Sequence, residues 1–188
     1  MANVRQILLR RRTVQNIVKI THTMEMIATS RFRQFQARAA SMRAYADGLT
    51  RMVYHTVQDA RLSVKPPLLE RHDDAGGEAL VVMVSNRGLC GGYNANILRL
   101  ALERIRQGRG EGRQVDVYAI GKRSHRFLRF RGIEPVWEIA QFERDVDPDA
   151  VDDLAGRLMD RFTAGELCSV QVAGATFVIA FLYWLWGA

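Results

Sequence analysis

Residues 3–59 carry a hydrophobic pattern that repeats at helical spacing. The apolar positions step by three or four residues, which is the period of one face of an α-helix. They are Met24, Ala28, Phe32, Phe35, Ala39, Met42, Ala46, Leu49, Val53 and Val57. The stretch contains no proline and a single glycine, Gly48. We therefore predict one continuous helix, about 80 Å long, within residues 1–61.

The apolar stripe on this helix is narrow and rich in alanine and methionine. Such a stripe suits one close helical partner better than a broad core. Its mean step, close to 3.6 residues, predicts that the pairing is only weakly supercoiled. We call the residues expected to contact the partner helix the seam: Ala28, Phe32, Phe35, Ala39, Met42, Leu49 and Val53.

After a predicted linker, residues 62–78, the pattern changes. Apolar runs of strand length alternate with amphipathic runs of helix length. Strands are predicted at 79–85, 114–121, 133–140 and 166–173, and helices at 93–108, 122–132 and 147–165. We expect Gly108 to stop the first of these helices and Asp147 to cap the last. The alternation predicts a small, mainly parallel, Rossmann-like α/β domain over residues 79–173.

Residues 174–188 form an apolar tail. No charged residue occurs from Ser169 onward, which approaches the length of a membrane span. However, the first part of this stretch fits the last strand, and no flanking positive charges mark an orientation. We expect a buried or irregular end rather than a membrane span.

Charge adds an asymmetry to this picture. Residues 1–61 hold eleven basic and three acidic residues, whereas residues 62–188 hold sixteen basic and seventeen acidic ones. The basic excess indicates an acidic or polyanionic partner for the long helix. Three interpretations stay open: a nucleic-acid-binding arm, an amphipathic membrane helix, or an axle with an apolar seam and basic flanks that face an acidic protein.

A second basic cluster falls in the predicted helix 122–132. Its members are Lys122, Arg123, Arg126, Arg129 and Arg131. The cluster is either a second binding surface or a solvated helix face.

A glycine-rich turn follows the first predicted strand, with Gly88, Gly91 and Gly92 inside residues 85–94. The turn lacks the lysine and hydroxyl residue of a P-loop, and its spacing does not match a dinucleotide-binding motif. We therefore predict a tight strand-to-helix turn in which the glycines supply positive φ angles.

Candidate catalytic groups are sparse. The four histidines have no cysteine or carboxylate at metal-ligand spacing. Cys90 and Cys168 match no metal or redox motif, so we expect two reduced thiols. Ser85 does not lie in a nucleophile elbow. The sequence predicts no catalytic residue, no cofactor and no metal site.

Two segments resemble one known family. VQNIVKITHTMEMIATSRFRQFQ, residues 14–36, is similar to its N-terminal helix pattern I-T-x-x-M-x-M-[IV]-A-x-S-[KR]. VSNRGLCGGYNANILR, residues 84–99, is similar to its more specific S-[DN]-[RK]-G-L-C-G-x-[YFL]-N pattern. Over about residues 1–173 the chain resembles the γ subunit of the F-type ATP synthase, the central rotor stalk. The matching turn residues are Arg87, Gly88, Leu89, Cys90, Gly91, Gly92 and Asn94.

The resemblance implies a non-catalytic subunit of a proton-transporting ATP synthase, with no cofactor, nucleic acid or small-molecule substrate bound by this chain. In the family, α and β subunits make ATP around the γ shaft, which a proton- or sodium-driven membrane c-ring turns. The implied partners are the α, β and ε subunits and the c-ring, at the cytoplasmic face of a bacterial membrane. By position, Met24, Glu25, Arg31 and Arg33 are expected to contact the catalytic collar.

The sequence also departs from the family pattern. Family members continue into a second long helix that packs antiparallel against the first, where this chain has the apolar tail. We expect a truncation, a frameshift or a separate chain that supplies the missing helix. Thr23, Glu25 and Phe32 differ from more usual family residues, which suggests a divergent branch. A basic-arm nucleic-acid-binding protein and a small nucleotide-dependent α/β enzyme are the alternatives.

Overall fold

The computed structural model describes residues 2–58, 66–70, 72–139 and 147–174. The chain divides into two compact units, Met1–Val64 and Lys65–Ala188. Apart from Gly174, the predicted apolar tail lies outside the described residues. The expectation of a buried or irregular end, like the predicted domain limits, therefore stays a prediction.

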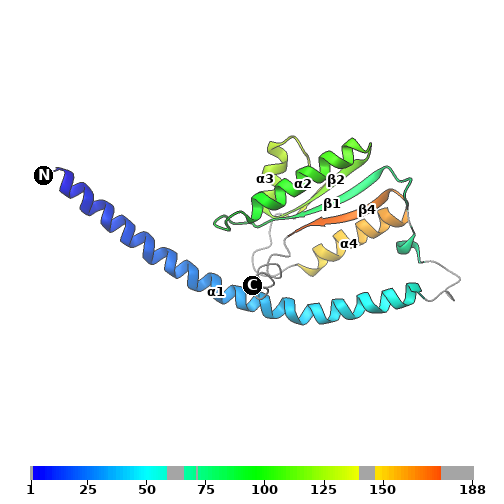
Figure 1. Cartoon of the computed structure of the whole chain (residues 1–188), viewed down its shortest axis with the longest axis horizontal. Helices are drawn as coiled ribbons and strands as arrows, with labels where there is room; N and C mark the ends of the chain where they lie inside the picture. Colours follow the sequence, from blue (N-terminus) through cyan, green and yellow to red (C-terminus); the bar gives the residue numbers. More distant parts are fainter. Residues whose placement is uncertain (1, 59–65, 71, 140–146, 175–188) are drawn as a thin grey trace, which may run out of the picture. The chain divides into compact units, whose positions relative to one another are not determined.

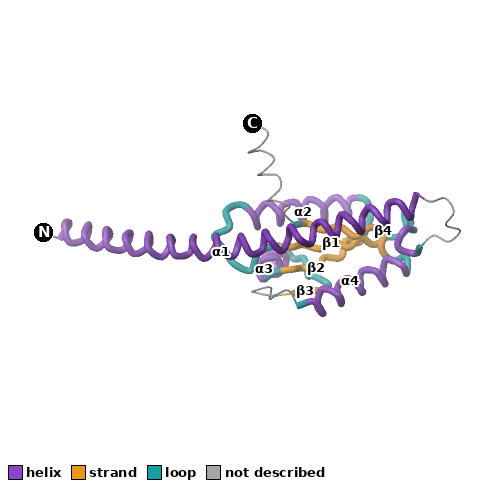
Figure 2. Tube along the Cα trace, turned by 90° about the horizontal axis from the view of Figure 1, so that it is seen from below, coloured by secondary structure: helices purple, strands orange, loops and turns teal. Residues whose placement is uncertain are grey.

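The first unit is a single helix, α1 (Ala2–Gln58), of 57 residues, drawn without interruption in Figures 1 and 2. Its length is roughly 85 Å at the usual rise per residue. No proline interrupts it, and the hydroxyls of Thr13, Thr21 and Thr50 donate to carbonyl oxygens four residues earlier. The prediction of one continuous N-terminal helix is confirmed.

The second unit alternates strands and helices, as the sequence predicts. Its elements are the 3-10 helix η1 (Pro67–Leu69), β1 (Gly77–Met83), α2 (Tyr93–Gly110), β2 (Gln114–Ile120), α3 (Lys122–Phe130), β3 (Trp137–Ile139), α4 (Pro148–Thr163) and β4 (Leu167–Ala173). Helix α4 begins as expected, because the Asp147 carboxylate accepts a hydrogen bond from the Asp149 amide at 3.2 Å.

The four strands form one parallel sheet in the order β3-β2-β1-β4. The predicted α/β class is confirmed, and every described strand pair is parallel. Helices α2 and α3 cover one face of the sheet and α4 covers the other (Figure 1). The inner strand β1 supplies both cores, because Leu80 and Val82 face α2 and α3 whereas Ala79 and Val81 face α4.

Two ion pairs, each with a buried carboxylate, join helices to opposite faces of the sheet. Glu78 on β1 is fully buried and pairs with Arg104 of α2, which donates from Nε at 2.7 Å. This hydrogen bond raises the pKa of the Arg104 guanidinium above its usual range. On the other face, Asp116 of β2 pairs with Arg161 of α4 at 2.8 Å. Each pair fixes one helix against the sheet.

Gly108 is not the end of α2, contrary to the prediction, because the helix continues to Gly110. Gly108 is buried, and a β-carbon there would lie 2.5 Å from Cγ2 of Val115. The glycine therefore allows α2 to approach β2 closely. The third strand is also shorter than the predicted 133–140: β3 begins at Trp137, after Pro135, which has no amide hydrogen to donate.

Candidate functional site

The seam of α1 is exposed along its whole length. This holds for Ala28, Phe32, Phe35, Ala39, Met42, Leu49 and Val53. Such a row of exposed apolar side chains is typical of a helix surface that contacts a partner. The contact of the seam with a partner helix stays a prediction.

The predicted collar contacts do not share one side of α1. At about 100° per residue, Met24 and Arg31 lie close to the seam, whereas Arg33 lies about 160° around the axis from Arg31. All four predicted contacts are exposed, and Glu25 pairs with His22 at 3.4 Å. A partner that contacts all four must therefore surround the helix.

The N-terminal half of α1 is apolar on more than one side, which the seam pattern did not reveal. Val4, Leu8, Val18 and Met26 are exposed and lie off the seam. A helix with apolar residues on several sides needs more than one contact surface. The signal was present in the sequence, because apolar residues recur there without one clear helical period.

The predicted glycine turn joins β1 to α2 and is held by its own side chains. The Ser85 amide donates to Oδ1 of Asn94 at 3.0 Å, and the Asn94 amide group donates to the Ser85 hydroxyl at 2.8 Å. Oδ1 of Asn86 accepts from the backbone amide of Lys122 at 2.9 Å, which joins the turn to the start of α3. These polar groups bind each other, so the turn is built as a structural connection rather than a phosphate cradle.

The backbone of the turn corrects one detail of the prediction. Of its three glycines only Gly91 has a positive φ, of 56°, and the other positive φ, of 62°, belongs to Leu89. A positive φ is uncommon for a residue other than glycine. Leu89 is 95% exposed, so the turn projects this side chain into solvent.

Tyr93 follows the turn and is partly buried. Burial raises the pKa of its phenol above the usual range, and nearby Cys90 adds to the shift. The folded state thus favours the neutral phenol. Its contribution to stability is complete below about pH 10 and is lost as the pH rises through the raised folded pKa. Cys90 and Cys168 are both free and partly buried.

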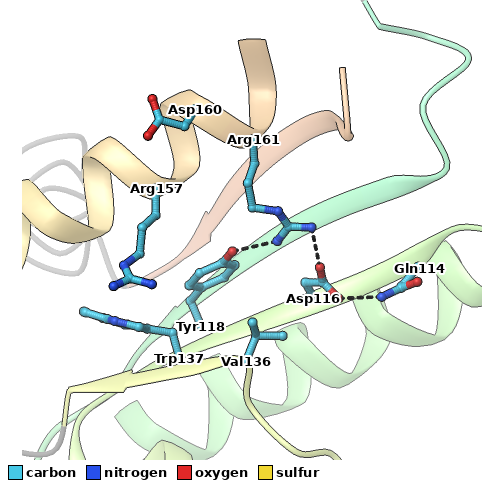
Figure 3. A pocket seen from close by; sticks show the side chains of 8 residues that line it. All are labelled: Gln114, Asp116, Tyr118, Val136, Trp137, Arg157, Asp160 and Arg161. Carbon is cyan, nitrogen blue, oxygen red and sulfur yellow. Dashed lines mark hydrogen bonds and ion pairs between the residues drawn. The ribbon is translucent and has the colours of Figure 1, made fainter. Parts of the chain in front are cut away.

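A cavity of about 520 Å³ lies between α4 and strands β2 and β3 (Figure 3). Arg161 crosses it to donate to Asp116 and to the Tyr118 hydroxyl, each at 2.8 Å. Its hydrogen bonds to Glu166, Asp116 and Tyr118 raise the pKa of the guanidinium above its usual range. The buried carboxylate in the cavity is thus neutralised by an arginine, and no nucleophile and base meet there.

In the part of the chain that the structure describes, no three histidine, cysteine or acidic side chains gather as metal ligands. No helix within that part of the chain combines the length and hydropathy needed to cross a bilayer.

Comparison with known proteins connects the long helix α1 and the glycine turn to one family. A family model described as ATP synthase matches residues 3–183, which extends ten residues beyond the resemblance noted in the sequence. The chain is 42% identical over 178 residues to the ATP synthase gamma chain of Rhodopirellula baltica, covering 95% of this chain and 60% of that relative.

Two further relatives carry the same name. The ATP synthase gamma chain of Gemmatimonas aurantiaca is 35% identical over 184 residues, covering 96% of this chain and 62% of the relative. That of Leptospira biflexa is 32% identical over 180 residues, again covering 96% and 62%. The chain thus spans about three fifths of the length of these curated relatives. The long helix, the glycine turn and the match over most of the chain agree: the chain belongs to the ATP synthase gamma chain family.

Proposed function

We propose that this chain acts as a central-stalk subunit of an F-type ATP synthase and couples rotation of an ion-driven membrane ring to ATP synthesis or hydrolysis. The observation that carries the proposal is the long helix α1, whose apolar seam is exposed. The family supports the same role, because the relatives named above are ATP synthase gamma chains.

The proposed mechanism needs no catalytic group on this chain. A shaft that presents different sides to chemically equal surrounding subunits makes different contacts with each of them. Each contact favours one conformation of the subunit and thereby shifts its population and its nucleotide affinity. Helix α1 has the required asymmetry, because the seam near Phe35 is apolar whereas Arg33 lies on the other side.

The partners in this proposal are the α and β subunits around α1, and the ε subunit and c-ring near the α/β unit. Met24, Glu25, Arg31 and Arg33 would contact the α and β subunits. A second long helix, supplied by another segment or chain, would cover the seam. The subunit would then be peripheral at the cytoplasmic face of the membrane. Arg87 and the glycine turn would belong to the structural part of the α/β unit.

Co-expression with the α and β subunits of the same organism tests the proposal. We expect the three chains to co-purify and the complex to hydrolyse ATP. Met24→Lys should impair assembly or coupling without changing nucleotide binding, because it places a charge on the apolar stripe. Gln34→Lys is the matched control, because it adds the same charge away from the stripe.

Two outcomes would overturn the proposal. If Met24→Lys assembles and couples normally, the seam assignment is wrong. If the chain fails to bind α and β but binds DNA with a steep salt dependence, the nucleic-acid alternative is correct. None of the relatives named above bears a name connected with nucleic acids, so that alternative gains no support from them.

A further inference from the structure

The two helical faces of the sheet carry opposite charge. Residues 93–134, which include α2 and α3, hold ten basic and four acidic residues. Residues 147–166, which include α4, hold two basic and six acidic residues. The near-neutral composition of the α/β unit therefore hides a positive face and a negative face. They lie on opposite sides of one sheet, because α2 and α3 cover one face and α4 covers the other (Figure 1).

Helix α3 concentrates the positive charge on its outward side. Ser124 and Leu128 are buried against the sheet. Lys122, Arg126 and Phe130 follow each other at steps of four residues on the opposite side of the helix. All three are exposed, and the Phe130 ring is 84% exposed. We call Lys122, Arg126 and Phe130 the outer row of α3.

The two cations of the outer row have no partner in the part of the chain that the structure describes. Neither the Lys122 nor the Arg126 side chain makes an ion pair or a hydrogen bond there. Neighbouring Arg129, by contrast, is paired with Glu134 at 2.9 Å. Two unpaired cations in line with an exposed aromatic ring form a surface that attracts anions.

We infer that the outer row of α3 binds the anionic headgroups of phospholipids. The row lies on the convex side of a helix, and the cavity described above is on the opposite face of the sheet. A headgroup layer, unlike an acidic protein, needs no matching hollow and receives an exposed phenyl ring at the boundary of its acyl chains. Basic side chains next to such a layer are attracted by its surface potential.

The acidic face that carries α4 determines how the α/β unit is oriented on an anionic surface. An anionic surface attracts α3 and repels the acidic first turn of α4, so the α/β unit should meet the surface with α3 first. This inference does not rest on the proposed rotor function, and its test requires neither assembly nor nucleotide.

A site-specific probe tests the inference on the full chain. With Cys90 and Cys168 replaced by serine, Phe130→Cys is labelled with an environment-sensitive fluorophore. Vesicles of phosphatidylcholine with one quarter phosphatidylglycerol should shift the emission to the blue, and 0.5 M NaCl should reverse the shift. A probe at exposed Met159 on α4, on the other face of the sheet, is the control. A membrane contact made through the basic, amphipathic helix α1 alone would leave position 130 in water.

Charge variants give the second measurement. Arg126→Gln should weaken the vesicle affinity reported at position 130 about fivefold, since one cation near an anionic membrane contributes about that factor. Arg157→Gln on α4 is the matched control and should change the affinity less than about twofold. Glycerophosphate at the same phosphate concentration should leave the probe unchanged, which separates a lipid surface from a free phosphate.

Three results would overturn the inference: no response at position 130 to the anionic vesicles, an equal response to pure phosphatidylcholine, or a response to polyglutamate but not to vesicles. The last would assign the outer row to an acidic protein instead.

Discussion

In the α/β unit, Leu80, Leu128 and Leu167 are shielded from solvent, with at most 2% of each residue exposed. On α1, Phe35 is 52% exposed and Leu49 is 44% exposed. The same kinds of side chain thus have opposite surroundings in one polypeptide. The α/β unit encloses its own core, whereas α1 holds its shape through backbone hydrogen bonds and leaves its apolar side chains exposed. The packing of the described residues therefore accounts for the apolar side chains of the α/β unit but not for those of α1.

Leucine truncation is the strongest test of this difference. Leu128→Ala should destabilise the α/β unit by about 3 kcal/mol, because it removes a fully buried side chain and leaves a cavity. Leu49→Ala is the matched change on α1 and should cost less than about 0.5 kcal/mol in the isolated chain. Urea unfolding followed by near-ultraviolet circular dichroism measures both. If the two variants lose similar amounts of unfolding free energy, the Leu49 side chain is buried against other residues in solution.

The buried ion pair of α2 gives the next largest effect. Arg104→Ala leaves the Glu78 carboxylate buried without its main partner and should cost about 3 kcal/mol or slightly less, because Arg113 lies 3.9 Å from the same carboxylate. Arg129→Ala removes an exposed pair and should cost at most about 1 kcal/mol. The comparison fails if the two variants unfold at the same urea concentration.

The glycine turn should contribute less. Asn94→Ala removes hydrogen bonds to both the amide and the hydroxyl of Ser85, and should cost about 1–2 kcal/mol. Faster hydrogen exchange at the Ser85 amide would localise the loss to the turn. The exposed side chain of Asn96 makes no hydrogen bond within the described residues, so Asn96→Ala should leave that exchange rate unchanged.

The smallest predicted effect is a gain of stability in α1, and the same substitution in α2 has the opposite sign. Gly48→Ala should stabilise α1 by about 0.5–1 kcal/mol, because no atom lies within 4 Å of the added β-carbon and alanine favours a helix. Gly108→Ala in α2 should destabilise, because its β-carbon would collide with Val115. Far-ultraviolet circular dichroism and thermal unfolding measure the pair. A loss of helix in Gly48→Ala would show that the space beside Gly48 is occupied.

The sequence predicted the elements better than their limits or their chemistry. The apolar period located α1, and the change of period located the four strands and the three α-helices of the α/β unit, but not the short helix η1 inside the predicted linker. Gly108 was misassigned because its role depends on the proximity of Val115, seven residues later, which no local pattern reveals. The exposed Leu89 was missed because nothing in its neighbours predicts a positive φ at a leucine. The Glu78–Arg104 pair was also missed, because its members are 26 residues apart in the sequence and only the fold brings them together.

The outer row of α3 shows a different limit. The basic cluster was visible in the sequence, but the sequence does not show which of its side chains are paired within the chain and which point away from the sheet. The positions of Glu134 and of the buried Leu128 show that Arg129 is paired and that Arg126 points away from the sheet.

The strand order β3-β2-β1-β4 also determines what a ribosome exposes. Strand β1 leaves the exit tunnel before its neighbours, yet it occupies an inner position, and the strand that closes its second side begins about 80 residues later. At a synthesis rate of about 5–20 residues per second, that side stays open for roughly 4–16 seconds, during which α1 is already exposed. Each newly made copy therefore presents an unpaired strand edge together with a long helix whose apolar side chains are exposed.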